Sequence, residues 1–244
     1  MKDILQDIIN HTLNLGDIDT LKVVGTATET VVTGKTEKNT VFMSGKFKTP
    51  VADFIGTFGM PNLPKLKTIL GFSEEYDENA KITVLKQKVE AIDQPATIHF
   101  ENKAGDFVND YRLMDKTIVE SKVPNVVFKG TKWDTDFEPT VAGIQRLKKQ
   151  SMLHSEDEVF KTTLKGGNLN VTFGNPSNYS GNFVFHSGLS GALTKTLGWP
   201  VKQFISIMDL LGDKHIYITD QGAMRITVDS GIAEYEYLLP AQSK

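Results

Sequence analysis

The chain has no cysteine among its 244 residues. A disulfide framework, a thiolate metal site and a cysteine nucleophile are therefore excluded, and we expect a reducing, intracellular compartment. No apolar run approaches the roughly 18 residues that a membrane-spanning helix needs. The first residues, MKDILQDIINHTLNLG, are too acidic and too interrupted for a signal peptide. These absences predict a cytoplasmic protein without a membrane partner.

The sequence also lacks the common motifs of catalysis. It contains no G-x-x-x-x-G-K-[ST], no G-x-G-x-x-G between a strand and a helix, and no G-x-S-x-G. The glycine-rich stretch SGLSGALTKTLG (187–198) could cradle a phosphate, but we interpret it as a flexible surface loop. The histidines are scattered, at positions 11, 99, 154, 186 and 215. We therefore predict a non-catalytic protein with no metal ion and no cofactor.

Two acidic stretches resemble metal sites only briefly. Asp134, Asp136 and Glu138 have the spacing that begins a calcium-binding loop. Pro139 stands where such a loop needs glycine, and no glutamate occupies the twelfth position, so we reject this interpretation. His154 precedes a run of acidic residues, and a solvated loop explains that run better than a ligand set.

Alternation with a period of two predicts strands through most of the chain. In residues 222–240, GAMRITVDSGIAEYEYLLP, two alternating runs flank a glycine-containing turn and predict a hairpin with one buried face. Apolar spacing predicts four helices, over residues 2–15, 61–72, 138–153 and 201–211. The expected strands cover residues 21–25, 28–33, 40–43, 51–57, 81–85, 96–101, 107–114, 126–128, 158–164, 168–173, 182–186, 214–219, 223–228 and 232–238.

The order of helices and strands in the first half of the chain repeats in the second half. This repeat predicts an α+β fold made of a duplicated domain, with two helices packed on antiparallel sheets in each copy. We expect the first domain at residues 1–115, a linker at 116–125 and the second domain at 126–244.

Positive charge gathers on the predicted helices. They carry seven basic and four acidic residues, whereas the whole chain has a net charge of −3. On a helical wheel, Arg146 and Lys149 fall opposite Val141, Ile144 and Leu147. Lys65 and Lys202 also fall away from the apolar sides of their helices, whereas Lys148 falls toward one and would have to snorkel. Solvated helix faces attract lysine in any protein, so this partition alone does not identify a function.

Two stretches resemble a known family. Residues 108–115, VNDYRLMD, resemble the last strand of the first domain in the sliding clamps of DNA replication, the family that includes proliferating cell nuclear antigen. The ending GIAEYEYLLPA resembles the final strand and apolar tail of that family. The second half looks most like the polymerase processivity factor of large tailed phages.

This resemblance implies a homotrimer that closes into a ring around double-stranded DNA, with the helices lining the hole. It implies sequence-independent binding of phosphates, a clamp loader ATPase that opens the ring, and the cytoplasm of an infected bacterial host if a phage encodes the chain. The implied DNA contacts are Lys65, Lys67, Arg146, Lys148, Lys149 and Lys202.

The resemblance also implies two protein-binding surfaces. Ring closure would pair residues 107–114 with an edge strand of the next subunit, for which residues 182–186 are our candidate. The residues expected there are Val108, Tyr111, Leu113, Phe183 and Phe185. DNA polymerase and other clients would bind through short peptides in an apolar pocket formed by Val119, Val123, Tyr237, Leu238, Leu239 and Pro240.

Two other functions stay open at this point. A non-catalytic, β-rich phage structural or scaffold protein would also lack cysteine and catalytic motifs, but it predicts no basic inner face. A ligand-binding enzyme of an unfamiliar type would use Asp134, Asp136 or His154, and it predicts binding of a divalent metal ion.

Overall fold

The computed structural model describes residues 1–16, 18–89, 92–123 and 132–242. The chain divides into two compact units, each made of separate segments. Unit 1 comprises Met1–Glu37, Met43–Val126 and Ser230–Tyr235, and unit 2 comprises Lys38–Phe42, Val127–Asp229 and Glu236–Lys244. Each unit thus contains short segments from the other half of the chain. The sequential boundary expected at the linker 116–125 stays a prediction. The expected strand at 126–128 lies outside the described residues.

Unit 1 begins with a helix whose buried face follows from its sequence. Leu5, Ile8, Ile9 and Thr12 recur at helical spacing and are buried. The next helix begins at Asn62, whose side chain accepts a hydrogen bond from the amide of Lys65 at 3.2 Å. The helices of this unit are α1 (Lys2–Thr12), α2 (Leu63–Leu70) and α3 (Lys116–Lys122), with 3₁₀ turns η1 (Leu13–Leu15) and η2 (Ala52–Phe54).

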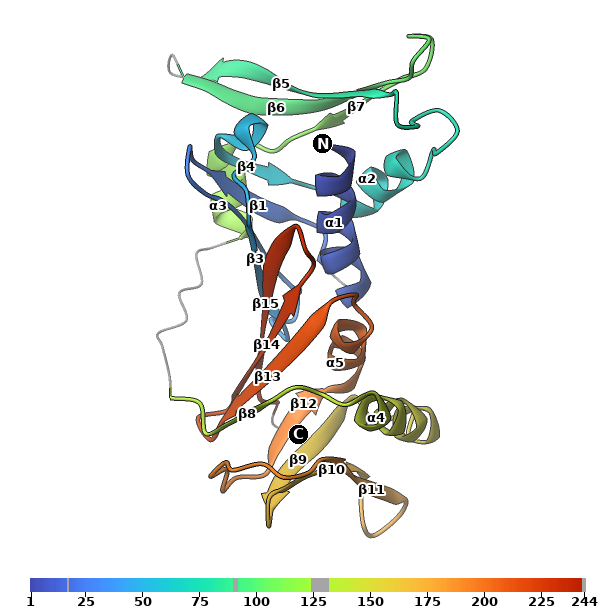
Figure 1. Cartoon of the computed structure of the whole chain (residues 1–244), viewed down its shortest axis with the longest axis vertical. Helices are drawn as coiled ribbons and strands as arrows, with labels where there is room; N and C mark the ends of the chain where they lie inside the picture. Colours follow the sequence, from blue (N-terminus) through green and yellow to red (C-terminus); the bar gives the residue numbers. More distant parts are fainter. Residues whose placement is uncertain (17, 90–91, 124–131, 243–244) are drawn as a thin grey trace. The chain divides into compact units, whose positions relative to one another are not determined.

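Two antiparallel sheets complete unit 1. Its first sheet has the order β4-β1-β2-β3, followed by the first part of β15, which belongs to this unit; its second sheet has the order β5-β6-β7 (Figure 1). In the first sheet Val23 lies opposite both Val32 and Phe58, and all three are buried. The strands are β1 (Leu21–Gly25), β2 (Thr30–Lys35), β3 (Phe42–Phe47), β4 (Gly56–Met60), β5 (Lys81–Val89), β6 (Ile92–Glu101) and β7 (Val108–Arg112).

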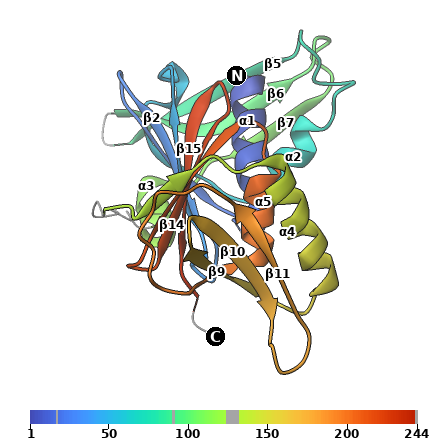
Figure 2. The same cartoon turned by 60° about the horizontal axis from the view of Figure 1, so that its bottom comes forward.

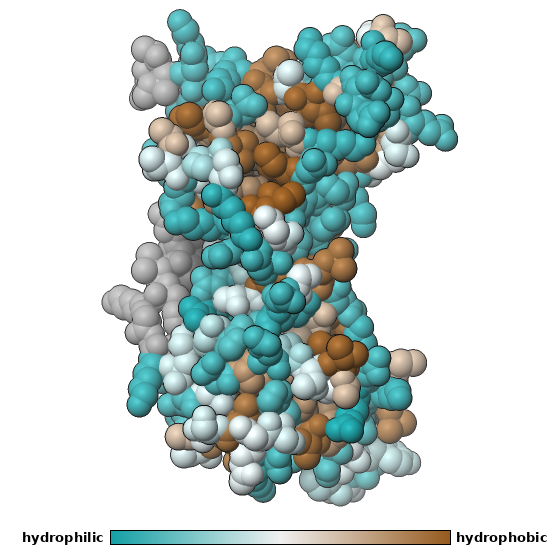
Figure 3. Space-filling model, in the orientation of Figure 1, coloured by the Kyte–Doolittle hydropathy of each residue, from teal (hydrophilic) through white to brown (hydrophobic). Residues whose placement is uncertain are grey.

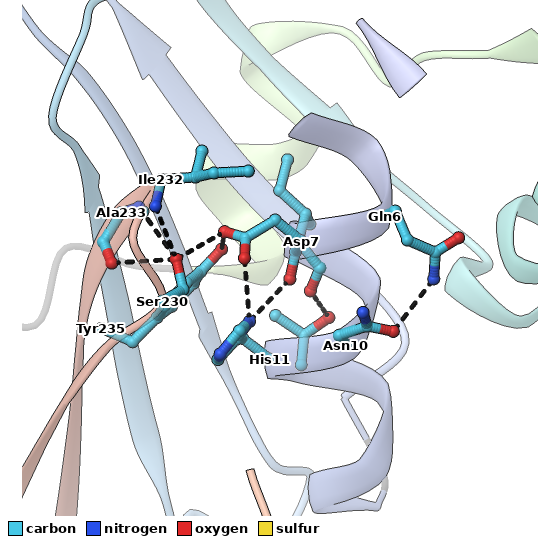
Figure 4. Close-up of polar contacts among 10 residues, drawn as sticks. Gln6, Asp7, Asn10, His11, Ser230, Ile232, Ala233 and Tyr235 are labelled. Atoms are coloured by element: carbon cyan, nitrogen blue, oxygen red, sulfur yellow. Dashed lines mark hydrogen bonds and ion pairs between the residues drawn. The ribbon is translucent and has the colours of Figure 1, made fainter. Parts of the chain in front are cut away.

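A buried polar cluster ties the C-terminal hairpin to α1 inside unit 1 (Figure 4). The carboxyl group of Asp7 accepts hydrogen bonds from the hydroxyls of Tyr235 at 2.8 Å and Ser230 at 3.1 Å. The ring of His11 lies 3.3 Å from the same carboxyl group and stacks on Tyr235 at 4.4 Å. Asp7 and His11 are buried, so these contacts hold residues from the two ends of the chain together in a dry site.

Unit 2 contains a second pair of helices on a second set of antiparallel strands. Figure 2 shows α4 and α5 side by side at the sheet that contains β9, β10 and β11. The helices are α4 (Val141–Leu153) and α5 (Val201–Met208). The strands are β8 (Thr135–Phe137), β9 (Val159–Lys165), β10 (Asn168–Gly174), β11 (Ser180–His186), β12 (Leu197–Pro200), β13 (Asp213–Thr219), β14 (Ala223–Asp229) and β15 (Ala233–Pro240).

The core of unit 2 is aromatic. Trp199 is fully buried and donates a hydrogen bond from its indole nitrogen to the hydroxyl of Thr162 at 2.8 Å. Phe160 packs against Phe173 and Phe204, with ring centroids 5.9 and 5.1 Å apart. This cluster fixes α5 on the sheet.

The two units repeat one strand order. The sheet β4-β1-β2-β3 follows α1, and the sheet β12-β9-β10-β11 follows α4 with the same connectivity. Strands β5, β6 and β7 correspond in the same way to β13, β14 and β15. The mixed fold with few helices and antiparallel sheets confirms the predicted fold class.

Several local predictions were wrong. Residues 52–54, expected in a strand, form η2, and the helix α3 was not foreseen. The stretch 187–198 is not simply a flexible surface loop, because it ends in β12 and buries Leu193 and Leu197. His154, expected in a solvated loop, is only 3% exposed and stacks on Phe173.

Candidate functional site

The basic residues predicted to contact DNA lie on three helices. Lys65 and Lys67 are exposed on α2, where Leu63 and Leu66 form the buried side. Lys202 is exposed in the first turn of α5. None of these three ammonium groups has an ion pair among the residues that the structure describes. They are therefore free to bind phosphate groups.

The basic residues of α4 differ in their surroundings. Lys149 is exposed, and Arg146 donates a hydrogen bond to the carbonyl of Val184 in β11 at 3.4 Å. Lys148 is half-buried and forms an ion pair with Asp209, the residue that follows α5. The carboxylate offsets the positive charge of Lys148, so this residue is the weakest of the six candidates for a phosphate contact.

The buried face of α4 is the predicted one only in part: Leu147 is fully buried and Ile144 is half-buried, as expected. Val141, also expected on the apolar side, is 71% exposed, and the helix is buried along Gly143 and Leu147. A β-carbon on Gly143 would lie 2.4 Å from the carbonyl oxygen of Phe185, so glycine allows the helix to approach β11 closely. Val141 and Met152 therefore share the solvent side of α4 with Lys149.

Apolar side chains interrupt the basic surface of unit 2. Met152, Leu153 and Leu211 are 79%, 72% and 82% exposed. Figure 3 shows brown side chains interspersed with teal ones over α4 and α5. The positive charge of this surface is sparse, which favours weak contacts with a polyanion over a tight grip.

The two strands predicted to seal a subunit interface are both edge strands. Among the residues described, β7 pairs only with β6, and β11 pairs only with β10. Val108 is 48% exposed on β7 and Phe183 is half-buried on β11. Each strand thus has one edge without a partner strand among the described residues.

Three other residues predicted at that interface are buried within their own units: Leu113, Phe185 and Tyr111. The hydroxyl of Tyr111 donates a hydrogen bond to the carbonyl of Pro61, and burial raises the pKa of this phenol. These three side chains pack inside their own units, so at these positions a second copy could contact the backbone of the strand but not the side chain.

The residues predicted for the peptide pocket lie on α3 and β15. Val119 is fully buried against Gly59, and Val123 is 5% exposed. The ammonium group of Lys22 donates a hydrogen bond to the carbonyl of Val123 at 3.1 Å, and burial lowers the pKa of Lys22. Of the expected linker, residues 116–122 are helical, and residues 124 and 125 lie outside the described part of the chain.

The apolar tail is anchored to unit 2. Tyr237 and Leu239 point into the core and are fully buried, whereas Leu238 and Pro240 are half-buried. After β15, the amide of Gln242 donates a hydrogen bond to the carbonyl of Gly198 at 2.9 Å. Of the six residues predicted for the pocket, Leu238 and Pro240 are the ones that are not buried.

The residues of the rival enzyme hypothesis have separate structural partners. The carboxyl group of Asp134 accepts hydrogen bonds from the hydroxyl of Thr219 and the amide of Asp220. Asp136 lies 2.7 Å from the ring of His215. In the described ranges no group of three or more histidine and acidic residues could hold a metal ion, and no helix could cross a membrane.

No protein-family model matches the chain, and no curated protein matches it. Among solved structures it is similar to one described as the C-terminal region of FEN-1 bound to A. fulgidus PCNA. That match has a TM-score of 0.68 at 10% sequence identity, and it covers 100% of this chain and 96% of that chain. The chain therefore has the PCNA-like clamp fold.

Proposed function

We propose that this chain is a sliding clamp of the tailed-phage type. Three copies encircle duplex DNA and tether a DNA polymerase for processive synthesis. A loader ATPase opens the ring, and the clamp itself carries out no reaction. Retention on DNA is topological, so the ring needs only weak, sequence-independent contacts with phosphates.

The observation that carries this proposal is the repeated strand order with two open edges. In unit 1, the outer edge of β3 is followed by the first part of β15. The equivalents of these two strands are β11 and β7, which have no such partner among the residues described. If β11 pairs with β7 of another copy, as β3 pairs with the first part of β15 inside unit 1, both open edges disappear.

The charge distribution supports the same proposal. The exposed cations Lys65, Lys67, Lys149 and Lys202 all lie on helices, in a chain whose net charge is −3. Helices that face the hole of the ring would place these cations near the DNA.

The half-buried Leu238 and Pro240 support binding of client peptides. The similar solved structure is described as the C-terminal region of FEN-1 bound to A. fulgidus PCNA. We infer that polymerase peptides bind this chain against Leu238 and Pro240 of β15.

Native mass spectrometry and a DNA-retention assay test the clamp proposal. The expected mass is about 81 kDa, three times the 27.1 kDa of one chain. Once loaded, the ring should stay on a nicked circle and leave linear DNA at its ends. Equal release from circular and linear DNA would refute the sliding clamp, and oligomers without DNA retention would favour the scaffold protein.

A test of the proposed client pocket requires a substitution that leaves the core intact. Removing the tail from Leu239 onward would also delete a fully buried side chain. Leu238→Asp changes a half-buried residue and should weaken stimulation of the polymerase without loss of the trimer. Stimulation equal to that of the unaltered protein would refute the assignment of this pocket.

A further inference from the structure

One strand of unit 2 has no counterpart in unit 1. In unit 2, β8 pairs antiparallel with the outer edge of β13 and leads into α4. In unit 1 the strand equivalent to β13 is β5, and α1 is equivalent to α4. No strand among the described residues lies on the outer edge of β5. The duplicated fold therefore has a strand position that is filled in one unit and open in the other.

The open position leaves the core of unit 1 incompletely covered. Ile216 and Ile218 of β13 face the core beside β8 and are both fully buried. On β5, Ile82 lies opposite Phe100 and Val84 lies opposite Ile98, so both point to the same core face as these buried partners. Ile82 and Val84 are nevertheless only half-buried.

Two other sheet edges, those of β4 and β12, also lie outside the proposed seam, and each of them has backbone hydrogen bonds on its outer side. Met114 exchanges two bonds of 2.8 Å with Gly59 of β4, and the amide of Gln242 bonds Gly198 of β12. The strand β8 has only three residues. By contrast β5 has nine residues, and within the described ranges no backbone hydrogen bond reaches its outer edge.

An open depression lies where the missing strand would meet the helix. Its volume is about 500 Å³, and its lining comes from the start of α1, the loop before β5 and the second residue of β5. The lining has three acidic side chains, Asp3, Asp77 and Glu78, and one basic side chain, Lys2. The ammonium group of Lys2 donates a hydrogen bond to the carbonyl of Tyr76. The depression therefore has more acidic than basic side chains.

The opposite end of β5 is basic. Lys86 and Lys88 are exposed, and neither has an ion pair among the residues described. Lysine on an edge strand deters pairing with uncharged or basic strands, but it attracts an acidic one. An incoming strand that runs antiparallel to β5, as β8 runs to β13, would place its N-terminal end at these lysines and its C-terminal end at the acidic depression.

We propose that the outer edge of β5 binds an extended segment of a partner protein by strand addition. The segment has acidic residues at its N-terminal end, apolar residues at alternate positions that cover Ile82 and Val84, and a basic residue at its C-terminal end. Backbone hydrogen bonds supply the affinity, and the alternate side chains supply the specificity. This surface is separate from the proposed ring seam and from the proposed client pocket, and it does not depend on DNA.

The test uses the intact protein and the fluorescently labelled peptide acetyl-Glu-Thr-Asp-Thr-Val-Thr-Phe-Thr-Lys-amide. Its alternate residues place the two acids opposite Lys88 and Lys86, and the two apolar residues opposite Val84 and Ile82. Fluorescence anisotropy should show saturable binding, and hydrogen exchange should slow in residues 81–89 but not in β7 or β11. Two further peptides have the same sequence with N-methyl groups, one on the odd-numbered residues and the other on the even-numbered residues, so that each has one edge of the strand blocked. Strand addition tolerates methyl groups on the outer edge of the peptide only, so one of these two should bind and the other should not.

Charge variants test the orientation. Lys86→Glu combined with Lys88→Glu should weaken binding by roughly five- to tenfold, because two exposed ion pairs are lost. The matched control is Lys161→Glu with Lys165→Glu, two exposed lysines on β9, and it should bind the peptide as the unaltered protein does. Equal binding of both methylated peptides, no binding at millimolar concentration, or protection of β11 in place of β5 would each overturn the proposal. A failure of the ring or of DNA retention would leave this result unaffected.

Discussion

Lys148 and Lys149 are neighbours on α4, and the structure predicts that only one of them contributes to DNA binding. Lys149 is exposed, whereas Lys148 is ion-paired with Asp209. Each phosphate contact adds about 0.9 to the slope of log affinity against log salt concentration. Between 50 and 200 mM salt, one contact therefore changes the affinity by a factor of about 3.5.

Three substitutions separate the two lysines. Lys149→Gln should flatten the salt dependence by up to about 0.9 for each copy that contacts a phosphate, and Lys148→Gln should leave it nearly unchanged. Asp209→Asn removes the partner of Lys148 and should steepen the dependence. The assay is fluorescence anisotropy of a labelled duplex at several salt concentrations, with urea denaturation to check that the variants remain folded.

Two outcomes would contradict the expected roles of Lys148 and Lys149. If Lys148→Gln flattens the slope as much as Lys149→Gln does, then Asp209 does not neutralise Lys148 in the complex. If neither substitution changes the slope, α4 does not face the DNA, and the proposed arrangement of the ring is wrong.

Three substitutions test the fold. Asp7→Ala should lower the free energy of unfolding by about 2–4 kcal/mol in urea denaturation, because Tyr235 and Ser230 lose a buried acceptor, while Asp3→Ala, on an exposed residue, should have little effect. Leu239→Ala should cost about 2–5 kcal/mol because the side chain is fully buried; a loss below about 1 kcal/mol would show that the tail is not part of the core. Gly143→Ala should cost about 1–3 kcal/mol and speed hydrogen exchange in β11, since its β-carbon would overlap the backbone of Phe185; unchanged exchange would contradict this packing.

The sequence predicted the elements with long, regular periodicity. The hairpin at 222–240 and the four principal helices all have enough residues for the period to be recognised. Short elements lack this signal. The strand β8 has three residues and β12 has four, and the seven residues of α3 include few apolar positions. Their structure depends on the neighbours that they pack against.

The sites were harder to predict for the same reason. A helical wheel placed Val141 on the buried side of α4, but the close approach of Gly143 to β11 decides which side is buried. The pairing of Lys148 with Asp209 joins residues 61 positions apart, and that of Asp7 with Tyr235 joins residues 228 positions apart. Contacts of this kind arise from the tertiary fold, and no local pattern in the sequence indicates them.

The proposed seam explains why the assembly should be a closed ring. β7 and β11 are different strands, so a contact between them is head-to-tail, and an unclosed row of copies keeps one open edge at each of its two ends. Each added copy is rotated by the same angle relative to the copy before it. The copies form a ring if a whole number of these rotations makes a full turn, and otherwise they form a filament. Three copies close the ring when each seam turns the next copy by one third of a full turn, and this is the trimer that we propose.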